Sequence, residues 1–458
     1  MFAKETYIQR RALLKKQLGS GVMLFLGNDE QGLNYEDNTF RYRQDSTFLY
    51  FFGLSCAGLS ALIDVDEDRE IIFGDELSID AIVWMGTQPT LGEQAAGVGI
   101  SDVRPSSELA PYLARAAAGR TIHYLPPYRA EHRLRLFDLL GLHPSQQPGS
   151  VPFIRAVVAQ RNVKSAEEIA EIERACDITA DMHLAAMRCL RPGMHEYEVV
   201  AEMNHVAQRN NCELSFATIA TINGQTLHNH YYGNLVKPGD LFLIDAGAEL
   251  PSGYCGDMSS TFPANPTFTQ QQREVYVIQN AMHLESVRAL RPGIPYMEVY
   301  ELSARVMVDG LKALGLMKGD TDDAVREGAH ALFYPHGLGH MMGLDVHDME
   351  NLGEIWVGYD GQPKSTQFGR KSQRLAIPLQ PGFVHTVEPG IYFIPELIDL
   401  WQGQHLHTDF INYDRVAAYR HLGGIRNEED YLITSTGARR LGKRIPLTPE
   451  EVEAERIR

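Results

Sequence analysis

The chain contains two copies of one eighteen-residue segment, and this internal repeat limits the folds that it can adopt. Residues 182–199 read MHLAAMRCLRPGMHEYEV, residues 282–299 read MHLESVRALRPGIPYMEV, and ten of the eighteen positions are identical. Each copy predicts a helix that ends at Pro-Gly, followed by a second helix. The offset of one hundred residues is too long for a solenoid, and two copies are too few. We therefore expect two related halves about a pseudo-twofold axis, with a cleft between them. The alternative is a common helix-ending pattern that occurs twice.

The part of the chain before the repeat predicts a separate, smaller α/β domain. At 458 residues, the chain has room for about two to four domains. Prolines in segment 144–152 mark a boundary, and the capping box Ser165–Glu168 starts a helix beyond it. We expect domains at residues 1–155 and 156–458. Within the first, the apolar patterns predict helices at 5–18, 109–118 and 131–140 and strands at 22–26, 48–52, 61–65 and 70–73.

Charge and cysteine content exclude several classes of function. Lys and Arg total 42 and Asp and Glu total 59, a net charge of −17. We expect no nucleic-acid partner, because binding to phosphates needs a basic surface. The five cysteines include no Cys-x-x-Cys pair, which argues against a cysteine zinc site or a disulfide framework. The N-terminus lacks a signal-peptide core, and no apolar run reaches the roughly 18 residues of a membrane span. We expect a cytoplasmic protein with no membrane partner.

Acidic residues stand at the ends of apolar strands in the larger domain. The run 241–244 predicts a strand buried on both faces, and it ends in Asp245. A turn at 251–253 follows, and a hairpin centred on residue 251 places Asp257 directly opposite Asp245, on the same face. Two neighbouring carboxylates in a buried position need a shared proton or a cation. The alternative is two unrelated turn aspartates.

Two further segments show the same arrangement. Pro-Gly precedes the apolar run 383–387, which ends in Glu388. Gly-Gly precedes a segment in which Arg426 and Glu428 share one face, because strand side chains alternate. Four acids at the ends of apolar strands favour a common site.

Histidines are concentrated between residues 336 and 347. His336 and His340 have the i, i+4 spacing of zinc ligands on a helix. Glycines at positions 337 and 339 disfavour a helix, so a zinc-protease helix is not expected. His228 and His230, in the segment TLHNHYY, are ambiguous from the pattern alone.

Together these segments resemble the pita-bread metallopeptidases, which include methionine aminopeptidase, aminopeptidase P and prolidase. Four segments carry the resemblance, in the family's order: IDAGAELPSGYCGD, HGLGHMMGLDVHD, TVEPGIY and GIRNEED. FRYRQDS and the segment 48–53 resemble the creatinase-like domain of aminopeptidase P and prolidase, which methionine aminopeptidase lacks. The implied fold class is α+β: a small N-terminal creatinase-like α/β domain followed by a C-terminal pita-bread domain with internal pseudo-twofold duplication.

The resemblance also implies a set of metal ligands. Matched position by position, they are Asp245, Asp257, His340, Glu388 and Glu428. They would bind two divalent ions, and four carboxylates with one imidazole favour Mn²⁺, with Co²⁺ and Zn²⁺ as alternatives. Two such ions activate a water molecule and polarise a scissile carbonyl. Glu429 directly follows Glu428, so Glu429 is the alternative ligand.

Further roles follow from the same resemblance. Glu388 matches the family's general acid/base, and His347 and His228 match positions that orient substrate and stabilise the oxyanion. His228, rather than His230, has the family's spacing before the first aspartate. Arg426 would support Glu428 or the substrate. On the substrate side, Tyr392 matches a tyrosine beside the site, and His336 either contacts substrate or only shapes its segment.

Three functions remain open at this point. Aminopeptidase P removes the first residue of a peptide whose second residue is proline, whereas prolidase cleaves only Xaa-Pro dipeptides. FRYRQDS is closer to aminopeptidase P, which we favour, but the long insertions at 348–387 and 393–422 are closer to prolidase. Arg374, in the basic stretch 364–374, would receive a dipeptide's carboxylate. The third function is non-catalytic peptide binding on the same scaffold. The resemblance further implies a homodimer or homotetramer.

Overall fold

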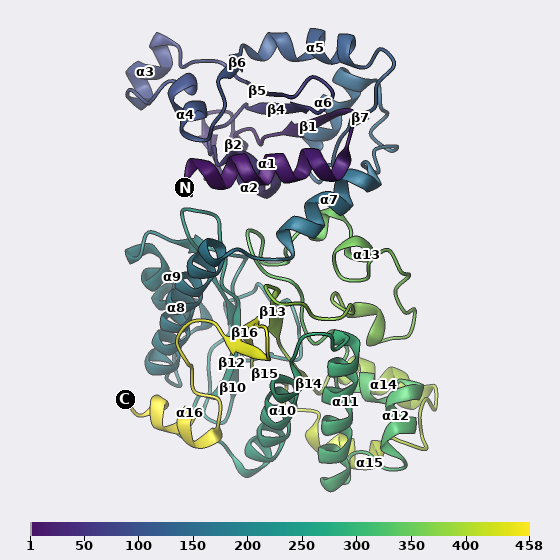
Figure 1. Cartoon of the computed structure of the whole chain (residues 1–458). Helices are drawn as coiled ribbons and strands as arrows, with labels where there is room; N and C mark the ends of the chain where they lie inside the picture. The colour runs from purple at the N-terminus through teal and green to yellow at the C-terminus, as the bar shows by residue number, and fades with distance from the viewer. Residues whose placement is uncertain (1) are drawn as a thin grey trace. The chain divides into compact units, whose positions relative to one another are not determined.

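The computed structural model describes residues 2–458, and the chain divides into two compact units (Figure 1). The first unit ends at Arg161 and also includes Met349–Trp356. The second consists of Asn162–Asp348 and Val357–Arg458. The boundary expected after residue 155 falls inside helix α7 (Val151–Arg161), which belongs to the first unit.

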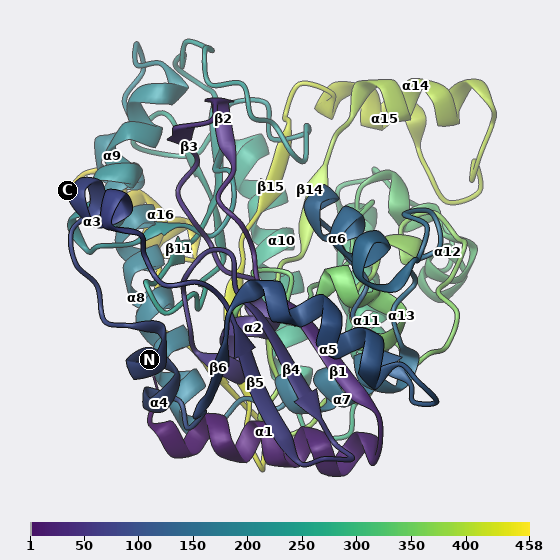
Figure 2. The ribbon, with the colours of Figure 1, turned by 90° about the horizontal axis from the view of Figure 1, so that it is seen from above.

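The first unit is built on a five-stranded mixed sheet with helices on both faces (Figures 1 and 2). The strand order is β6 (Asp102–Arg104), β5 (Arg69–Phe73), β4 (Ser60–Asp64), β1 (Val22–Leu26) and β7 (Ile122–His123). The central strands pair antiparallel and the two edge strands pair parallel. Strands β2 (Gly32–Tyr35) and β3 (Asn38–Thr39) form a separate hairpin. The helices are α1 (Lys4–Leu18), α2 (Ser46–Phe52), α3 (Ile79–Met85), α4 (Leu91–Gly97), α5 (Leu109–Ala116), α6 (Ala130–Leu140) and α7.

The two faces of this sheet bury alternate residues of each strand. Val22 and Leu24 of β1 pack with Leu113 of α5 on one face. Phe25 points to the other face, where its ring contacts Phe51 of α2 and Phe153 of α7 at centroid distances of 5.6 and 5.1 Å. Side chains of a strand alternate between its two faces, so the continuous apolar run 22–26 is buried on both.

The prediction of a strand at residues 48–52 is wrong, because this segment forms α2. The Asp45 side chain accepts a hydrogen bond from the Phe48 amide and caps the helix. Gly53, at a φ of +62°, ends it in the left-handed conformation. An uninterrupted apolar run such as TFLYFF has no period of its own, so it does not distinguish a buried strand from a buried helix.

The second unit contains the repeat as two helix pairs. The first copy forms the end of α8 (Ala166–Cys189) and the start of α9 (Glu196–Arg209), and the second forms the same parts of α10 (Gln270–Ala289) and α11 (Tyr296–Ala313). The glycine of each Pro-Gly turn has a positive φ, +95° at Gly193 and +86° at Gly293. The capping box at Ser165 is present at the start of α8.

The first helices of the two pairs, α8 and α10, pack on different sets of short strands (Figure 1). Helix α8 packs on a sheet of order β12 (Met258–Pro263), β10 (Leu241–Ala246) and β9 (Ile219–Thr221). Helix α10 packs on β13 (Val384–Val387), β14 (Gly390–Tyr392) and β15 (Gly424–Arg426). The remaining named elements are β8 (Glu213–Leu214), β11 (Ala248–Glu249), β16 (Glu429–Ile433), β17 (Ala438–Arg440), α12 (Thr321–Glu327), α13 (Glu354–Val357), α14 (Pro395–Gly403), α15 (Tyr413–Val416) and α16 (Pro449–Arg456). Among the described residues, no helix is both long and apolar enough to cross a membrane.

The register of the β10–β12 hairpin differs from the prediction. Asp245 pairs with Ser259, and Ala246 pairs with Met258, so the hairpin is centred on residue 252 rather than 251. Asp257 is therefore not opposite Asp245. It lies two residues before Ser259, which is the residue that pairs with Asp245. Because side chains two residues apart on a strand lie on one face, this shift leaves Asp257 on the side of the hairpin that faces the same cavity.

Candidate metal centre

Loops and strand ends of the second unit surround one cavity of about 500 Å³. This volume is in the usual range of small-ligand pockets. Acidic residues reach it from the ends of β10, β12, β13 and β16, which come from both related halves. The sequence-predicted residues that line it are His228, Asp245, Asp257, His336, His340, His347, Arg374, Glu388, Arg426 and Glu428. Four of the acids and one histidine, scattered over nearly two hundred positions, thus meet at one place.

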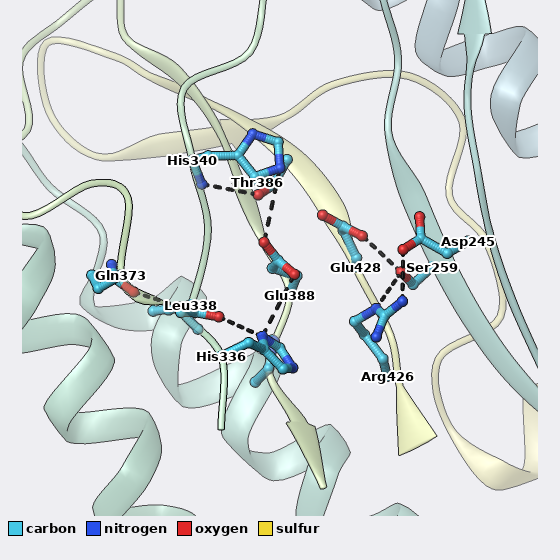
Figure 3. Close-up of polar contacts among 12 residues, drawn as sticks. Asp245, Ser259, His336, Leu338, His340, Gln373, Thr386, Glu388, Arg426 and Glu428 are labelled. Atoms are coloured by element: carbon cyan, nitrogen blue, oxygen red, sulfur yellow. Dashed lines mark hydrogen bonds and ion pairs between the residues drawn. The ribbon is translucent and has the colours of Figure 1, made fainter. Parts of the chain in front are cut away.

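Three of these residues are close enough for a single cation. One ligand atom each of Asp257, His340 and Glu428 lie within 4.8 Å of one another. The His340 Nε2 atom is 3.4 Å from Asp257 Oδ2. It is also 3.8 Å from Glu388 Oε1, a contact that Figure 3 shows. The Oδ1 atoms of Asp245 and Asp257 are buried and have no hydrogen-bond partner among the described residues. Buried oxygens that no proton donor reaches fit a cation, so the residues present are those that a divalent metal needs.

The electrostatics of the cluster agree with this fit. Burial, reinforced by the neighbouring carboxylates, raises the pKa of Asp257 and of Glu428 well above the usual range. Burial also raises the pKa of Glu388 to about 7, although Arg426 and Arg374 oppose that shift. In contrast, burial lowers the pKa of His340 far below its ordinary value, so the ring is neutral and has a lone pair for a metal.

Arg426 connects the acidic residues on one side of the cavity (Figure 3). Its guanidinium donates to Asp245 Oδ2 at 2.6 Å, to Ser259 Oγ at 2.9 Å and to the Tyr392 hydroxyl at 2.6 Å. The Ser259 hydroxyl in turn donates to Glu428 Oε2 at 2.7 Å. Sequence reasoning missed Ser259, and the correct hairpin register, which pairs it with Asp245, is the signal that identifies it.

Tyr392 and His336 form a second connected pair beside Glu388. Tyr392 does not line the cavity but lies behind it, where its hydroxyl is 2.9 Å from His336 Nε2. The other ring nitrogen of His336 is 2.7 Å from the Gly337 carbonyl and 3.7 Å from Glu388 Oε2. Burial lowers the pKa of His336 to about 3, so this ring is neutral. None of the described residues from 335 to 340 is helical, as the glycines at 337 and 339 predicted.

His347 and His228 also line the cavity. The His347 ring lies 4.2 Å from the His340 ring, at an interplanar angle of 63°. The His228 side chain is largely exposed. Its partial burial and the nearby charge of Arg426 together lower its pKa. His230, which the spacing argument set aside, also lines the cavity.

Glu429, the alternative ligand, is engaged elsewhere. It does not line the cavity. Its carboxylate accepts from the Tyr431 hydroxyl at 2.7 Å and from Arg440 at 3.3 Å, and it lies 3.3 Å from His283 Nε2. Its position on the opposite side of the backbone from Glu428 follows from the alternation of strand side chains.

The repeated histidines hold equivalent places in the two halves. His183, in the first copy, has its ring nitrogens 2.9 Å from Ser260 Oγ and 3.2 Å from the Ala246 carbonyl. His283, in the second copy, contacts Glu429. Each therefore contacts the residue that follows a cavity acid, Asp245 in one half and Glu428 in the other.

A cleft of buried acids and a neutral imidazole between two duplicated halves defines a metal-dependent hydrolase. Residues 170–435 match the model of metallopeptidase family M24, and residues 7–124 match the aminopeptidase P N-terminal domain. The chain belongs to metallopeptidase family M24 and has the expected α+β fold with a duplicated pita-bread domain.

Individual relatives agree with this assignment. The chain is 34% identical to the Xaa-Pro aminopeptidase of Escherichia coli strain K12, over 99% of this chain and 97% of that protein. It is 30% identical to the human Xaa-Pro dipeptidase, over 96% of this chain and 89% of that one. Among solved structures, E. coli aminopeptidase P with the inhibitor Pro-Leu superposes with a TM-score of 0.82 at 31% identity, over 100% of this chain and 99% of that one. Proline aminopeptidase P II from Yersinia pestis has the same TM-score and identity, with 100% of both chains covered.

Proposed function

We propose that the chain is a metal-dependent Xaa-Pro aminopeptidase, which hydrolyses the bond between the first residue of a peptide and a proline in second position. The observation that carries this proposal is the convergence of Asp245, Asp257, His340, Glu388 and Glu428 on one cavity. The end-to-end match to a Xaa-Pro aminopeptidase supports the choice of substrate.

In this proposal, the same five residues hold two divalent ions. Four carboxylates and one imidazole favour Mn²⁺, with Co²⁺ and Zn²⁺ as the alternatives. When bound, the ions lower the pKa of a water molecule and polarise the scissile carbonyl. Arg426 orients Asp245 through its 2.6 Å hydrogen bond, and Ser259 orients Glu428 through one of 2.7 Å.

Glu388 is the proposed general acid/base. Its carboxylate takes a proton from the attacking water and delivers that proton to the leaving nitrogen. This delivery matters because a proline nitrogen in a peptide bond carries no N–H of its own. In the protein without metal, burial raises the pKa of Glu388 to about 7, and a bound divalent ion would lower it.

Two imidazoles that line the cavity are the proposed substrate contacts. In this proposal, His347 and His228 donate hydrogen bonds to the substrate carbonyl and to the oxyanion that develops on it. The contact between the Tyr392 hydroxyl and His336 Nε2 holds the His336 ring beside Glu388.

The second candidate function is cleavage of Xaa-Pro dipeptides only. The observation in its favour is Arg374, a cation on the cavity wall that can bind the carboxylate of a dipeptide. The similarity to the human Xaa-Pro dipeptidase supports the same reading. The third candidate function is non-catalytic peptide binding. The presence of all four acids and of His340 argues against it, because a binding protein has no need of a metal site.

The deciding experiment compares two substrates on the Mn²⁺-loaded protein. Gly-Pro and Gly-Pro-Leu share the scissile bond but differ in where the carboxylate lies. We expect a higher kcat/KM for the tripeptide. Hydrolysis of Gly-Pro alone would establish the dipeptidase, and hydrolysis of neither would leave peptide binding.

The proposal includes a homodimer or homotetramer in the cytoplasm. Helix α3 supports self-association, because Ile79, Val83 and Trp84 are 76%, 74% and 86% exposed. Contiguous apolar surface of this kind marks protein contacts. The cytoplasmic location is supported by the five cysteines, none of which is in a disulfide.

A further inference from the structure

Lys164 forms a buried ion pair with Asp348. The Lys164 Nζ atom lies 3.0 Å from Asp348 Oδ2, and each side chain is only 1% exposed. Lys164 directly precedes Ser165, which caps α8, and Asp348 directly follows His347. The pair therefore links the start of the duplicated region to the loop that follows His340 and carries His347.

The loop from Met341 to Asp348 is closed by its own hydrogen bonds. The Asp348 amide donates to the Met341 carbonyl at 2.9 Å, and the Gly343 amide donates to the Asp345 carbonyl at 3.1 Å. His340 precedes this loop, and His347 lies at its end. Asp348 is therefore tied to the start of the loop and is the residue next to His347.

Lys164 also contacts the strand that leads to Glu388. Its amide donates to the Gly382 carbonyl at 2.9 Å, just before β13. The histidine segment pairs with that same strand, since the Met342 amide donates to Val384 and the Thr386 amide donates to His340, both at 3.0 Å. One residue therefore contacts both chain segments that carry the central site residues.

Gly343 shows how closely these groups pack. A Cβ atom added at position 343 would lie 2.8 Å from Asp348 Oδ2 and 3.1 Å from the Lys164 Cε atom. The Gly343 carbonyl accepts from the Cys255 amide at 3.0 Å, two residues before Asp257. The contacts of Lys164 thus continue, through the loop, to a third site residue.

Stability alone does not account for a lysine at this place. A buried ion pair is often no more stabilising than two apolar residues of similar size, because both charges lose their hydration. We propose that Lys164 is a positioning residue: through Asp348, its ammonium group holds the 341–348 loop so that the His347 imidazole stays beside His340 and faces the substrate. This inference rests on the role of His347 in the proposed function.

A double variant separates positioning from stability. Lys164→Met with Asp348→Leu removes both charges, so we expect the melting temperature to stay within a few degrees of the parent. Turnover should nevertheless fall at least tenfold in kcat, with Mn²⁺ affinity within threefold. The control is Arg120→Met with Asp64→Leu, an ion pair of the first unit with 2.7 Å between Arg120 Nη1 and Asp64 Oδ1, which should leave kcat unchanged. Unchanged kcat in the Lys164/Asp348 variant would overturn the proposal.

The route through His347 is tested by a double-mutant cycle. If Lys164 acts through His347, the Lys164/Asp348 change should alter kcat less than twofold once His347 is Ala. An equal loss in both backgrounds would show that the pair acts on something else.

A spectroscopic readout separates failure of this inference from failure of the proposed function. In protein with ¹³C-labelled histidines, loss of a signal in His347→Ala assigns the His347 ring. We expect that signal to shift or broaden in the Lys164/Asp348 variant and to stay in place in the Arg120/Asp64 control. An unmoved signal refutes the positioning role even in a protein without peptidase activity. If the signal moves but the parent protein shows no turnover, the proposed peptidase function is wrong and the positioning role is retained.

Discussion

At the scale of the residue, the acids of the site have different surroundings. Asp245 accepts a hydrogen bond from Arg426, whereas Glu388 lies in a buried position that raises its pKa to about 7. Carboxylates in such different environments can take different parts in one reaction. This division of roles gives two predictions at this scale.

The first concerns Glu388. Glu388→Gln keeps the shape of the side chain but cannot accept a proton, so we expect kcat to fall by roughly 10²- to 10⁴-fold. Calorimetry should still detect Mn²⁺ binding, with reduced affinity. Glu396→Gln, on α14 and away from the cavity, is the matched control. Near-normal turnover of the Glu388 variant would remove this residue from its role.

The second concerns Arg374 and the length of the substrate. If Arg374 binds the carboxylate of a dipeptide, Arg374→Met loses a charge-assisted hydrogen bond of about 1.5–3 kcal/mol. The KM for Gly-Pro should then rise by roughly 10- to 100-fold, while that for Gly-Pro-Leu changes much less. Equal changes for both substrates would mean that Arg374 does not read the dipeptide carboxylate.

At the scale of the element, short strands place the acids and the paired helices hold the strands. Residues 22–26 and 48–52 are both continuous apolar runs. The first forms the expected strand and the second forms a helix, because a run without a period does not distinguish the two. The predicted centre of the β10–β12 hairpin is one residue from the centre in the structure. The length of a turn does not determine which residues pair across it.

Helix α3 carries the prediction for this scale. Val83→Asp with Trp84→Asp places two charges on its exposed apolar surface, so we expect a shift toward monomer in light scattering after size-exclusion chromatography. The fold should be unaffected, because none of the α3 residues is buried. The control is Leu134→Asp on α6, an apolar residue that is also exposed, at 60%. An unchanged molar mass would exclude α3 from the contact.

At the scale of the whole molecule, stability and metal binding are linked through pH. Asp257, Glu388 and Glu428 have pKa values raised by burial, so the native protein without metal holds more protons on them than the unfolded chain does. Their contribution to stability is therefore present at low pH and lost as the pH rises through their folded pKa values. Buried histidines have the opposite effect on stability below about pH 6.5. Burial lowers their pKa, as for His330 and His340, so stability falls as the pH falls and the unfolded chain binds more protons.

These opposite signs predict a stability maximum near pH 6.5 for the metal-free protein. Between about pH 6.5 and 8 the free energy of unfolding should fall by an amount on the order of 1–2 kcal/mol, measured by urea denaturation after chelation. Asp257→Asn should flatten this decline.

Removing and restoring the metal should change the peptidase activity as well as the stability. Chelation should abolish hydrolysis, and Mn²⁺ should restore it better than Mg²⁺. The stabilisation by Mn²⁺ should also grow from pH 6.5 to 8, because the ion binds deprotonated carboxylates. Full activity in the chelated protein would contradict the proposed mechanism.

By itself, the sequence determined the duplicated architecture and the identities of the cavity acids, because periodicity, turn residues and motif order are local properties of the chain. Only the tertiary structure decided that Asp245 pairs with Ser259, that Glu428 rather than Glu429 lines the cavity, and that Lys164 lies against Asp348. These contacts join residues up to 184 positions apart. They depend on how separate elements pack, and no pattern within a single segment encodes that packing.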